Sequence, residues 1–208
     1  MAEAPKQFEL IVVGDPGVGK TTFINSHVSG ESNKRHVPTI GAEVSPLHFS
    51  TNYGEIVFTT RDITDPEKLA DGRGNFYTGA ECAIIMFDVS SSTTYENVSV
   101  WYRDVTGACP NIPIILCGNK VDVANRQVKP RDIYFHRHYA MQYYNVSTRS
   151  MFNIEKVFLW LSQILTTKND LTFIGDHFNA STITVDTAEI EKEPAEALQS
   201  RVSDDEEF

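Results

Sequence analysis

Residues 14–21 read GDPGVGKT and match the pattern G-x-x-x-x-G-K-[ST]. An apolar run at residues 8–13 precedes this stretch, and a helix is predicted to begin directly after it, over Lys20–Val28. The glycines allow backbone N–H groups to surround a phosphate, and the helix amino end adds its dipole. A chance match in a glycine-containing turn is the alternative, but the flanking strand and helix disfavour it. The stretch therefore predicts a phosphate site in an α/β fold.

Two side chains of this stretch, and two outside it, are candidates for holding phosphate and metal. Lys20 would reach the β- and γ-phosphates, and the Thr21 hydroxyl would ligate Mg²⁺. Asp62 follows an apolar run and is placed to hold the same Mg²⁺ through water. Thr39 is a further candidate ligand, with an ordinary loop threonine as the alternative. The predicted metal ligands are thus Thr21, Thr39 and Asp62.

Residues 119–122 read NKVD and come directly after a predicted strand. The Asp122 carboxylate can accept hydrogen bonds from guanine N1–H and from its 2-amino group, whereas adenine offers neither donor there. Asn119 can bridge the base and the phosphate loop, and the stem of Lys120 can cover the ring plane. The string by itself also suits a polar turn. Its position roughly 100 residues after the phosphate loop favours a guanine site.

Strand-like and helix-like segments alternate along most of the chain, and N-Y-G at residues 52–54 indicates a hairpin turn. The pattern predicts an α/β fold, with a doubly wound, mostly parallel six-stranded sheet and one antiparallel edge strand. The predicted strands are residues 8–13, 44–49, 55–60, 82–89, 112–117 and 141–146. The predicted crossover helices are residues 20–28, 93–105, 130–139 and 153–165.

Charge divides the 208-residue chain into two parts. Residues 181–208 hold nine acidic and two basic side chains, so −7 of the net charge of −10 lies there. We therefore predict a domain over residues 7–168 and an extension over 169–208 with a marginal helix and a disordered acidic end. The charge distribution also disfavours direct binding of nucleic acid or of an anionic membrane.

The cysteines and the chain ends suggest an intracellular protein. Three cysteines are too few and too scattered for a disulfide or zinc framework. The first residues lack the apolar core of a signal peptide, and neither a myristoyl nor a prenyl motif is present. We expect a monomer without a membrane anchor.

These motifs, at these spacings, resemble those of Ras-superfamily small GTPases, and longer stretches resemble the nuclear transport branch, Ran. The resemblance covers residues 7 to about 168. It is carried by residues 19–23, 82–89, 111–122, 135–137 and 158–161, and by an acidic end in place of a prenylated cysteine.

The resemblance implies the ligands, the partners and a set of nucleotide-binding positions. It implies GTP or GDP with Mg²⁺, importin-β-type transport receptors, an exchange factor, a GTPase-activating protein, and residence in nucleus and cytoplasm. The nucleotide-binding positions would be Asp15, Gly17, Val18, Gly19, Lys20, Thr21, Thr22, Thr39, Asp65, Asn119, Lys120, Asp122, Ser147, Thr148 and Arg149.

The chain departs from the family where hydrolysis takes place. Residues 62–67 read DITDPE where the family reads DTAGQE, so Pro66 stands at the position of the catalytic glutamine and no catalytic residue is assigned. Pro16 replaces a usual glycine, and Thr148 and Arg149 replace the Ala-Lys of the base loop. Two readings stay open: a GTPase switch with impaired hydrolysis, and a pseudo-GTPase that holds nucleotide as an interaction module. A kinase or ATPase is disfavoured by Asp122 and by the lack of a substrate domain or lid.

Overall fold

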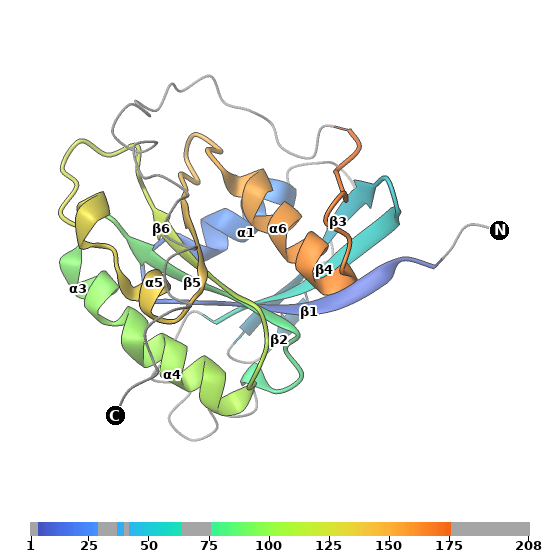
Figure 1. Cartoon of the computed structure of the whole chain (residues 1–208), viewed down its shortest axis with the longest axis horizontal. Helices are drawn as coiled ribbons and strands as arrows, with labels where there is room; N and C mark the ends of the chain where they lie inside the picture. The colour runs from blue at the N-terminus through green and yellow to red at the C-terminus, as the bar shows by residue number, and fades with distance from the viewer. Residues whose placement is uncertain (1–3, 29–36, 40–41, 64–75, 176–208) are drawn as a thin grey trace, which may run out of the picture.

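The computed structural model describes residues 4–28, 37–39, 42–63 and 76–175. Its centre is a seven-stranded sheet with the strand order β2-β3-β4-β1-β5-β6-β7 (Figure 1). Strand β1 lies between β4 and β5 and is parallel to both, and β6 and β7 continue the parallel part. The strands are β1 Lys6–Val13, β2 Val37–Thr39, β3 Ala42–Thr51, β4 Gly54–Asp62, β5 Cys82–Asp88, β6 Ile114–Asn119 and β7 Gln142–Asn145.

The predicted α/β architecture, mostly parallel with an antiparallel edge, is confirmed. The six predicted strands correspond to β1 and β3–β7, and the hairpin turn at residues 52–54 joins β3 to β4. The predicted number of strands is too low by one, because β2 adds a further strand antiparallel to β3. With three residues, β2 is too short to give an alternating apolar signal.

Helices cover both faces of the sheet, with α1 and α6 on one face and α3 and α4 on the other (Figure 1). Along β1, Leu10 and Val12 join the cluster under α1 and α6, whereas Ile11 and Val13 join the cluster under α4. Successive strand residues point to opposite faces, so a strand covered on both sides is apolar throughout. The helices are α1 Lys20–Val28, α3 Ser92–Glu96, α4 Val98–Ala108, α5 Phe135–His138 and α6 Ile154–Thr166.

Two of the four predicted helices differ from those observed. The segment predicted as a helix over 93–105 is two helices, α3 and α4, which meet at Asn97. The segment predicted over 130–139 forms a 3-10 turn at Pro130–Asp132 and then the short helix α5. Between these two, Ile133 is buried in an extended conformation, and the hydroxyl of Tyr95 accepts the N–H groups of residues 134 and 135. Tertiary contacts therefore replace helical hydrogen bonds there.

The first residues of the predicted extension, 169–175, pack against the β-sheet domain. Leu171 is fully buried, and the Phe173 ring stacks on Phe49 of β3 with 4.7 Å between centroids. The backbone N–H of Ile174 donates to the carbonyl of Ser50 over 2.8 Å. This part of the predicted extension therefore covers the β3–β4 hairpin. The marginal helix and acidic end predicted for the rest of the extension lie outside the described residues.

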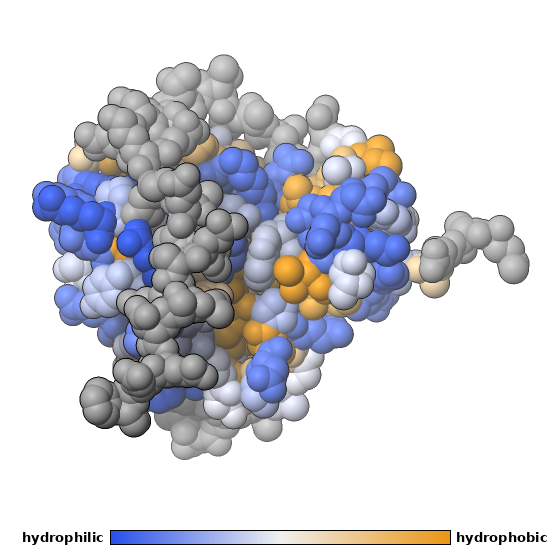
Figure 2. All heavy atoms as spheres, in the orientation of Figure 1, coloured by the Kyte–Doolittle hydropathy of each residue, from blue (hydrophilic) through white to orange (hydrophobic). Residues whose placement is uncertain are grey.

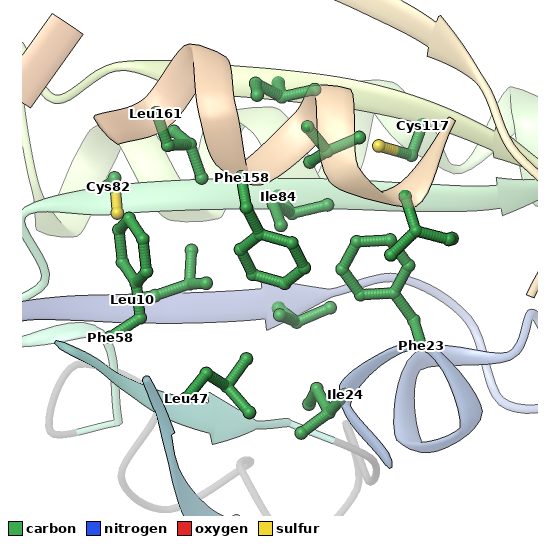
Figure 3. Packing of buried hydrophobic residues seen from close by; sticks show 14 of the residues in the cluster. Leu10, Phe23, Ile24, Leu47, Phe58, Cys82, Ile84, Cys117, Phe158 and Leu161 are labelled. Atoms are coloured by element: carbon green, nitrogen blue, oxygen red, sulfur yellow. The ribbon is translucent and has the colours of Figure 1, made fainter. Parts of the chain in front are cut away.

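The core beneath α6 is built around Phe158, whose ring points from the helix toward the sheet (Figure 3). Its centroid lies 5.3 Å from that of Phe23, 5.0 Å from that of Phe49 and 5.9 Å from that of Phe58. This one side chain therefore joins α1, β3, β4 and α6.

Phe158→Ala is expected to lower the free energy of unfolding by about 3–5 kcal/mol, because it leaves a cavity among three rings. The measurement is urea unfolding under identical buffer and ligand conditions for all variants, since a bound ligand shifts apparent stability. Ile164→Ala on the same helix is the control, because Ile164 is 44% exposed. Equal losses in the two variants would contradict this account of the core.

The face seen in Figure 2 is mainly hydrophilic, with hydrophobic residues in small separate groups, as is usual for a surface in water. The described helices include none that combines the length and the apolar character needed to cross a membrane.

Candidate functional site

Four parallel strands bring the phosphate loop and three polar side chains to their common carboxyl end. The phosphate loop follows β1, while Asp62, Asp88 and Asn119 are the last residues of β4, β5 and β6. Because these strands are parallel neighbours, their carboxyl ends lie side by side, where α/β proteins bind ligands. The fold therefore unites two motifs that lie far apart in the sequence.

The glycine-rich loop between β1 and α1 packs too tightly for side chains at two positions. At Gly14 a Cβ atom would lie 2.1 Å from the carbonyl oxygen of Met86, and at Gly19 it would lie 2.4 Å from the amide nitrogen of Asn119. Both residues also have positive φ, of 142° and 102°. The loop leads directly into α1, whose first residues are Lys20, Thr21 and Thr22, the last two exposed. This is the strand–loop–helix geometry that the motif requires.

The ammonium group of Lys20 is buried, with 4% of the residue exposed, and donates to the carbonyls of Gly14 and Asp15 over 2.7 and 3.0 Å. Burial lowers the pKa of Lys20, and the negative charges of Asp62 and Asp15 oppose this by raising it. A phosphate group beside the ammonium would favour the charged form further. The loop, the helix amino end and Lys20 therefore fit a phosphate.

The Thr21 hydroxyl donates to the Oδ2 atom of Asp62, which is 2% exposed. The described residues contain no group of three or more His, Cys, Asp or Glu side chains that could hold a metal by themselves. Mg²⁺ commonly takes one or two protein oxygens together with phosphate oxygens and water. Thr21 and Asp62 therefore fit Mg²⁺ bound beside a phosphate.

Thr39, the third predicted ligand, lies on a strand two places along the sheet from β4. Its backbone lies in β2, opposite Ala42 of β3, and β3 separates it from Asp62 of β4. The role of Thr39 as a third Mg²⁺ ligand therefore stays a prediction.

Asp15 lies in the phosphate loop, but its carboxylate is bound to the helices beside the loop. Its Oδ1 atom accepts from Trp101 Nε1 and its Oδ2 atom accepts from Asn97 Nδ2, both over 2.7 Å. Only the backbone of Asp15 is therefore available to a phosphate. Neither partner was predicted from the sequence, because both lie in a segment predicted as an ordinary helix, where Trp101 resembles a core residue.

The base motif is fastened to the phosphate loop by Asn119. Its amide nitrogen donates to the Val18 carbonyl over 2.8 Å, and its amide oxygen accepts from the Thr148 N–H over 3.1 Å. A longer contact, 3.4 Å, joins the Asn119 amide to the Thr148 hydroxyl. The predicted bridge from Asn119 to the loop is thus present.

Lys120 fastens the loop at a second point. Its ammonium donates to the Gly17 carbonyl over 2.8 Å and forms an ion pair of 2.6 Å with Asp88 of β5. Burial acts to raise the pKa of Asp88, but the hydrogen bonds from Lys120 and Ser90 outweigh it, so the pKa lies below its usual value. Asp88 was missed in the sequence, where it ends an apolar strand without a motif of its own.

Asp122 is held by the loop that contains the other predicted base contacts. The Ser147 hydroxyl donates to Asp122 Oδ1 over 2.6 Å, and Ser147 Oγ accepts from the Ser150 N–H over 3.1 Å. Thr148 lies beside Asn119, while Arg149 is exposed. The carboxylate is therefore oriented by a neighbouring side chain at the place predicted for guanine.

A model of the Ras family matches residues 9–167. The chain belongs to the Ras family. Ras-family proteins are switches that bind GTP or GDP together with Mg²⁺. The site fits these ligands, with the phosphate loop and Lys20 at the phosphates and Thr21 with Asp62 at the metal ion. The Ras-family segment with Asp65 and Pro66 lies outside the described residues.

Proposed function

We propose that this Ras-family protein is a Ran-like guanine-nucleotide switch with impaired GTP hydrolysis, which acts in nucleocytoplasmic transport. The observation that carries the guanine part is the Asp122 carboxylate, held by Ser147 beside the Asn119 bridge. A carboxylate there suits the two donors of guanine and rejects adenine.

The transport role is supported by the resemblance of particular segments, above all residues 111–122, 135–137 and 158–161. The partners we propose are importin-β-type receptors that bind the GTP form, an exchange factor and a GTPase-activating protein. The protein would be a monomer present in nucleus and cytoplasm, without direct contact to nucleic acid.

A second function is favoured by Asp65 and Pro66. With these residues in place of Gly and Gln, the chain can hold GDP or GTP without turnover and serve as a pseudo-GTPase interaction module. Measured turnover separates this possibility from a slow switch.

One experiment tests the guanine and the transport parts. The nucleotide released by denaturing the purified protein is identified by chromatography, and GDP or GTP is the expected result. The protein is then loaded with GDP or with a non-hydrolysable GTP analogue and titrated with an importin-β-type receptor. Tighter binding of the GTP-analogue form is expected. Release of an adenine nucleotide would contradict the guanine assignment, and equal receptor binding by both forms would contradict the switch.

A further inference from the structure

We propose that Asn97 and Trp101 are positioning residues that act through Asp15 to hold the phosphate loop and to slow nucleotide release. The inference rests on the proposed binding of guanine nucleotides, and it concerns a contact that lies outside the nucleotide's own binding surface.

The contact uses both oxygens of one carboxylate. Trp101 Nε1 donates to Oδ1 and Asn97 Nδ2 to Oδ2, each over 2.7 Å. Two donors on two oxygens determine both the position and the plane of the Asp15 side chain, and hydrogen bonds to an ionised acceptor are stronger than neutral ones. Trp101 is itself immobilised, because 6% of it is exposed and it packs in the cluster beneath α4.

Asp15 also positions Lys20, through the backbone carbonyl of Asp15. The Asp15 carbonyl accepts from Lys20 Nζ over 3.0 Å, so the chain of contacts runs from Trp101 through Asp15 to the lysine expected at the phosphates. Loss of the side-chain anchor frees the loop at this point. We therefore expect the main effect on phosphate binding and none on the choice of base.

The hydrogen bonds to Asp15 come from a different part of the fold than those of the base motif. Lys120 and Asn119, at the end of β6, hold the loop at Gly17 and Val18. Asn97 and Trp101 lie 82 and 86 residues from Asp15, at the junction of α3 and α4 and in the first half of α4. The phosphate loop is thus held by two separate sets of hydrogen bonds. One comes from Asn119 and Lys120 of the base motif, and the other comes from Asn97 and Trp101.

The experiment measures the dissociation rate of a fluorescent GDP analogue from the full chain in excess unlabelled GDP. Trp101→Phe keeps an aromatic ring but removes the N–H donor, and we expect release to be about 10-fold faster. Asn97→Ala should act in the same direction. Trp160→Phe is the matched control, because Trp160 lies on α6 and packs against the opposite cluster.

A double-mutant cycle distinguishes positioning through Asp15 from a general effect on the core. In an Asp15→Ala background, Trp101→Phe should change the release rate no further, because its acceptor is already absent. In Trp160→Phe protein, Trp101 is the sole tryptophan, and its emission should change when nucleotide is removed. That change should disappear in the Asp15→Ala background.

Each outcome bears on a different claim. Wild-type release by Trp101→Phe, or the same acceleration in both backgrounds, would overturn the positioning role alone. The relative affinity for GDP and inosine diphosphate should stay the same in all these variants, and a change confined to base selection would also overturn it. Failure of the unchanged chain to retain GDP would overturn both this inference and the proposed guanine site.

Discussion

Asp122→Asn is expected to weaken the binding of GDP and GTP by about 10²- to 10⁴-fold and to create a preference for xanthine nucleotides. The carboxylate would accept two hydrogen bonds from guanine, and each bond to a charged group contributes about 1.5–3 kcal/mol. An amide retains one acceptor but presents a donor to the guanine 2-amino group. Xanthine carries a carbonyl at that position and accepts from the amide.

The contacts of Asp122 determine which way the amide would face. Ser147 Oγ already accepts from the Ser150 N–H, and its own hydroxyl hydrogen is directed to Asp122 Oδ1. The amide oxygen is therefore expected to stay toward Ser147, which directs the NH₂ group to the base. Asp122→Asn thus replaces a hydrogen-bond acceptor that faces the base with a donor, while the local geometry is preserved.

The measurement is competition of GDP and xanthosine diphosphate against a fluorescent nucleotide, with thermal unfolding as a check on folding. Asp132→Asn is the matched control, because Asp132 is an exposed carboxylate in the 3-10 turn. The control should bind GDP like the unchanged chain. Unaltered GDP affinity in Asp122→Asn would remove Asp122 from the base site.

A second large effect is expected from repair of the segment after β4. The unchanged chain should hydrolyse GTP slowly, respond little to an activating protein and prefer GDP to GTP. The double change Asp65→Gly with Pro66→Gln should raise the rate of GTP hydrolysis at least about 10-fold above that of the unchanged chain. An activating arginine contributes roughly 10³–10⁵ in rate when the site is intact, so the stimulated rate should recover most.

The reason lies in the chemistry of the two residues. Hydrolysis in the family needs a glutamine to orient water, and the Pro66 ring has neither a donor nor an acceptor. Proline also lacks an N–H and disfavours the α conformation of the residue before it. The Asp65 carboxylate would repel the γ-phosphate, which is present in GTP and absent from GDP. Pro16, in place of the family's usual glycine, is expected to add bulk where the activating arginine would enter.

Single-turnover hydrolysis with and without the activating protein tests this. Pro66→Ala is the control for the glutamine, because it removes the ring without supplying an amide. Only the change to glutamine should restore turnover. Stimulated hydrolysis by the unchanged chain at the rate usual for Ran-like proteins would contradict the interpretation of this segment.

Local patterns were sufficient to predict the elements that form the site. A strand, a glycine-rich loop and a helix follow one another at residues 6–28. Their geometry could be predicted because it depends mainly on residues that are close together in the sequence. The NKVD string likewise placed Asn119 at the end of β6 and Asp122 in the turn that follows it. Continuous apolar runs predicted a sheet covered on both faces, because each strand face needs its own helices.

Apart from the Asn119 bridge to the phosphate loop, the long-range side-chain contacts of the site were not predicted, since no local pattern encodes them. The partners of Asp15 lie more than 80 residues away in helices that resemble ordinary core helices, and Asp88 meets Lys120 only because β5 and β6 are parallel neighbours. Tertiary packing likewise drew residues 169–175 onto the β3–β4 hairpin and placed Thr39 at the sheet edge. The sequence determined which groups are able to bind phosphate and base. The tertiary structure decided which of them meet, because side-chain hydrogen bonds depend on strand order and helix placement.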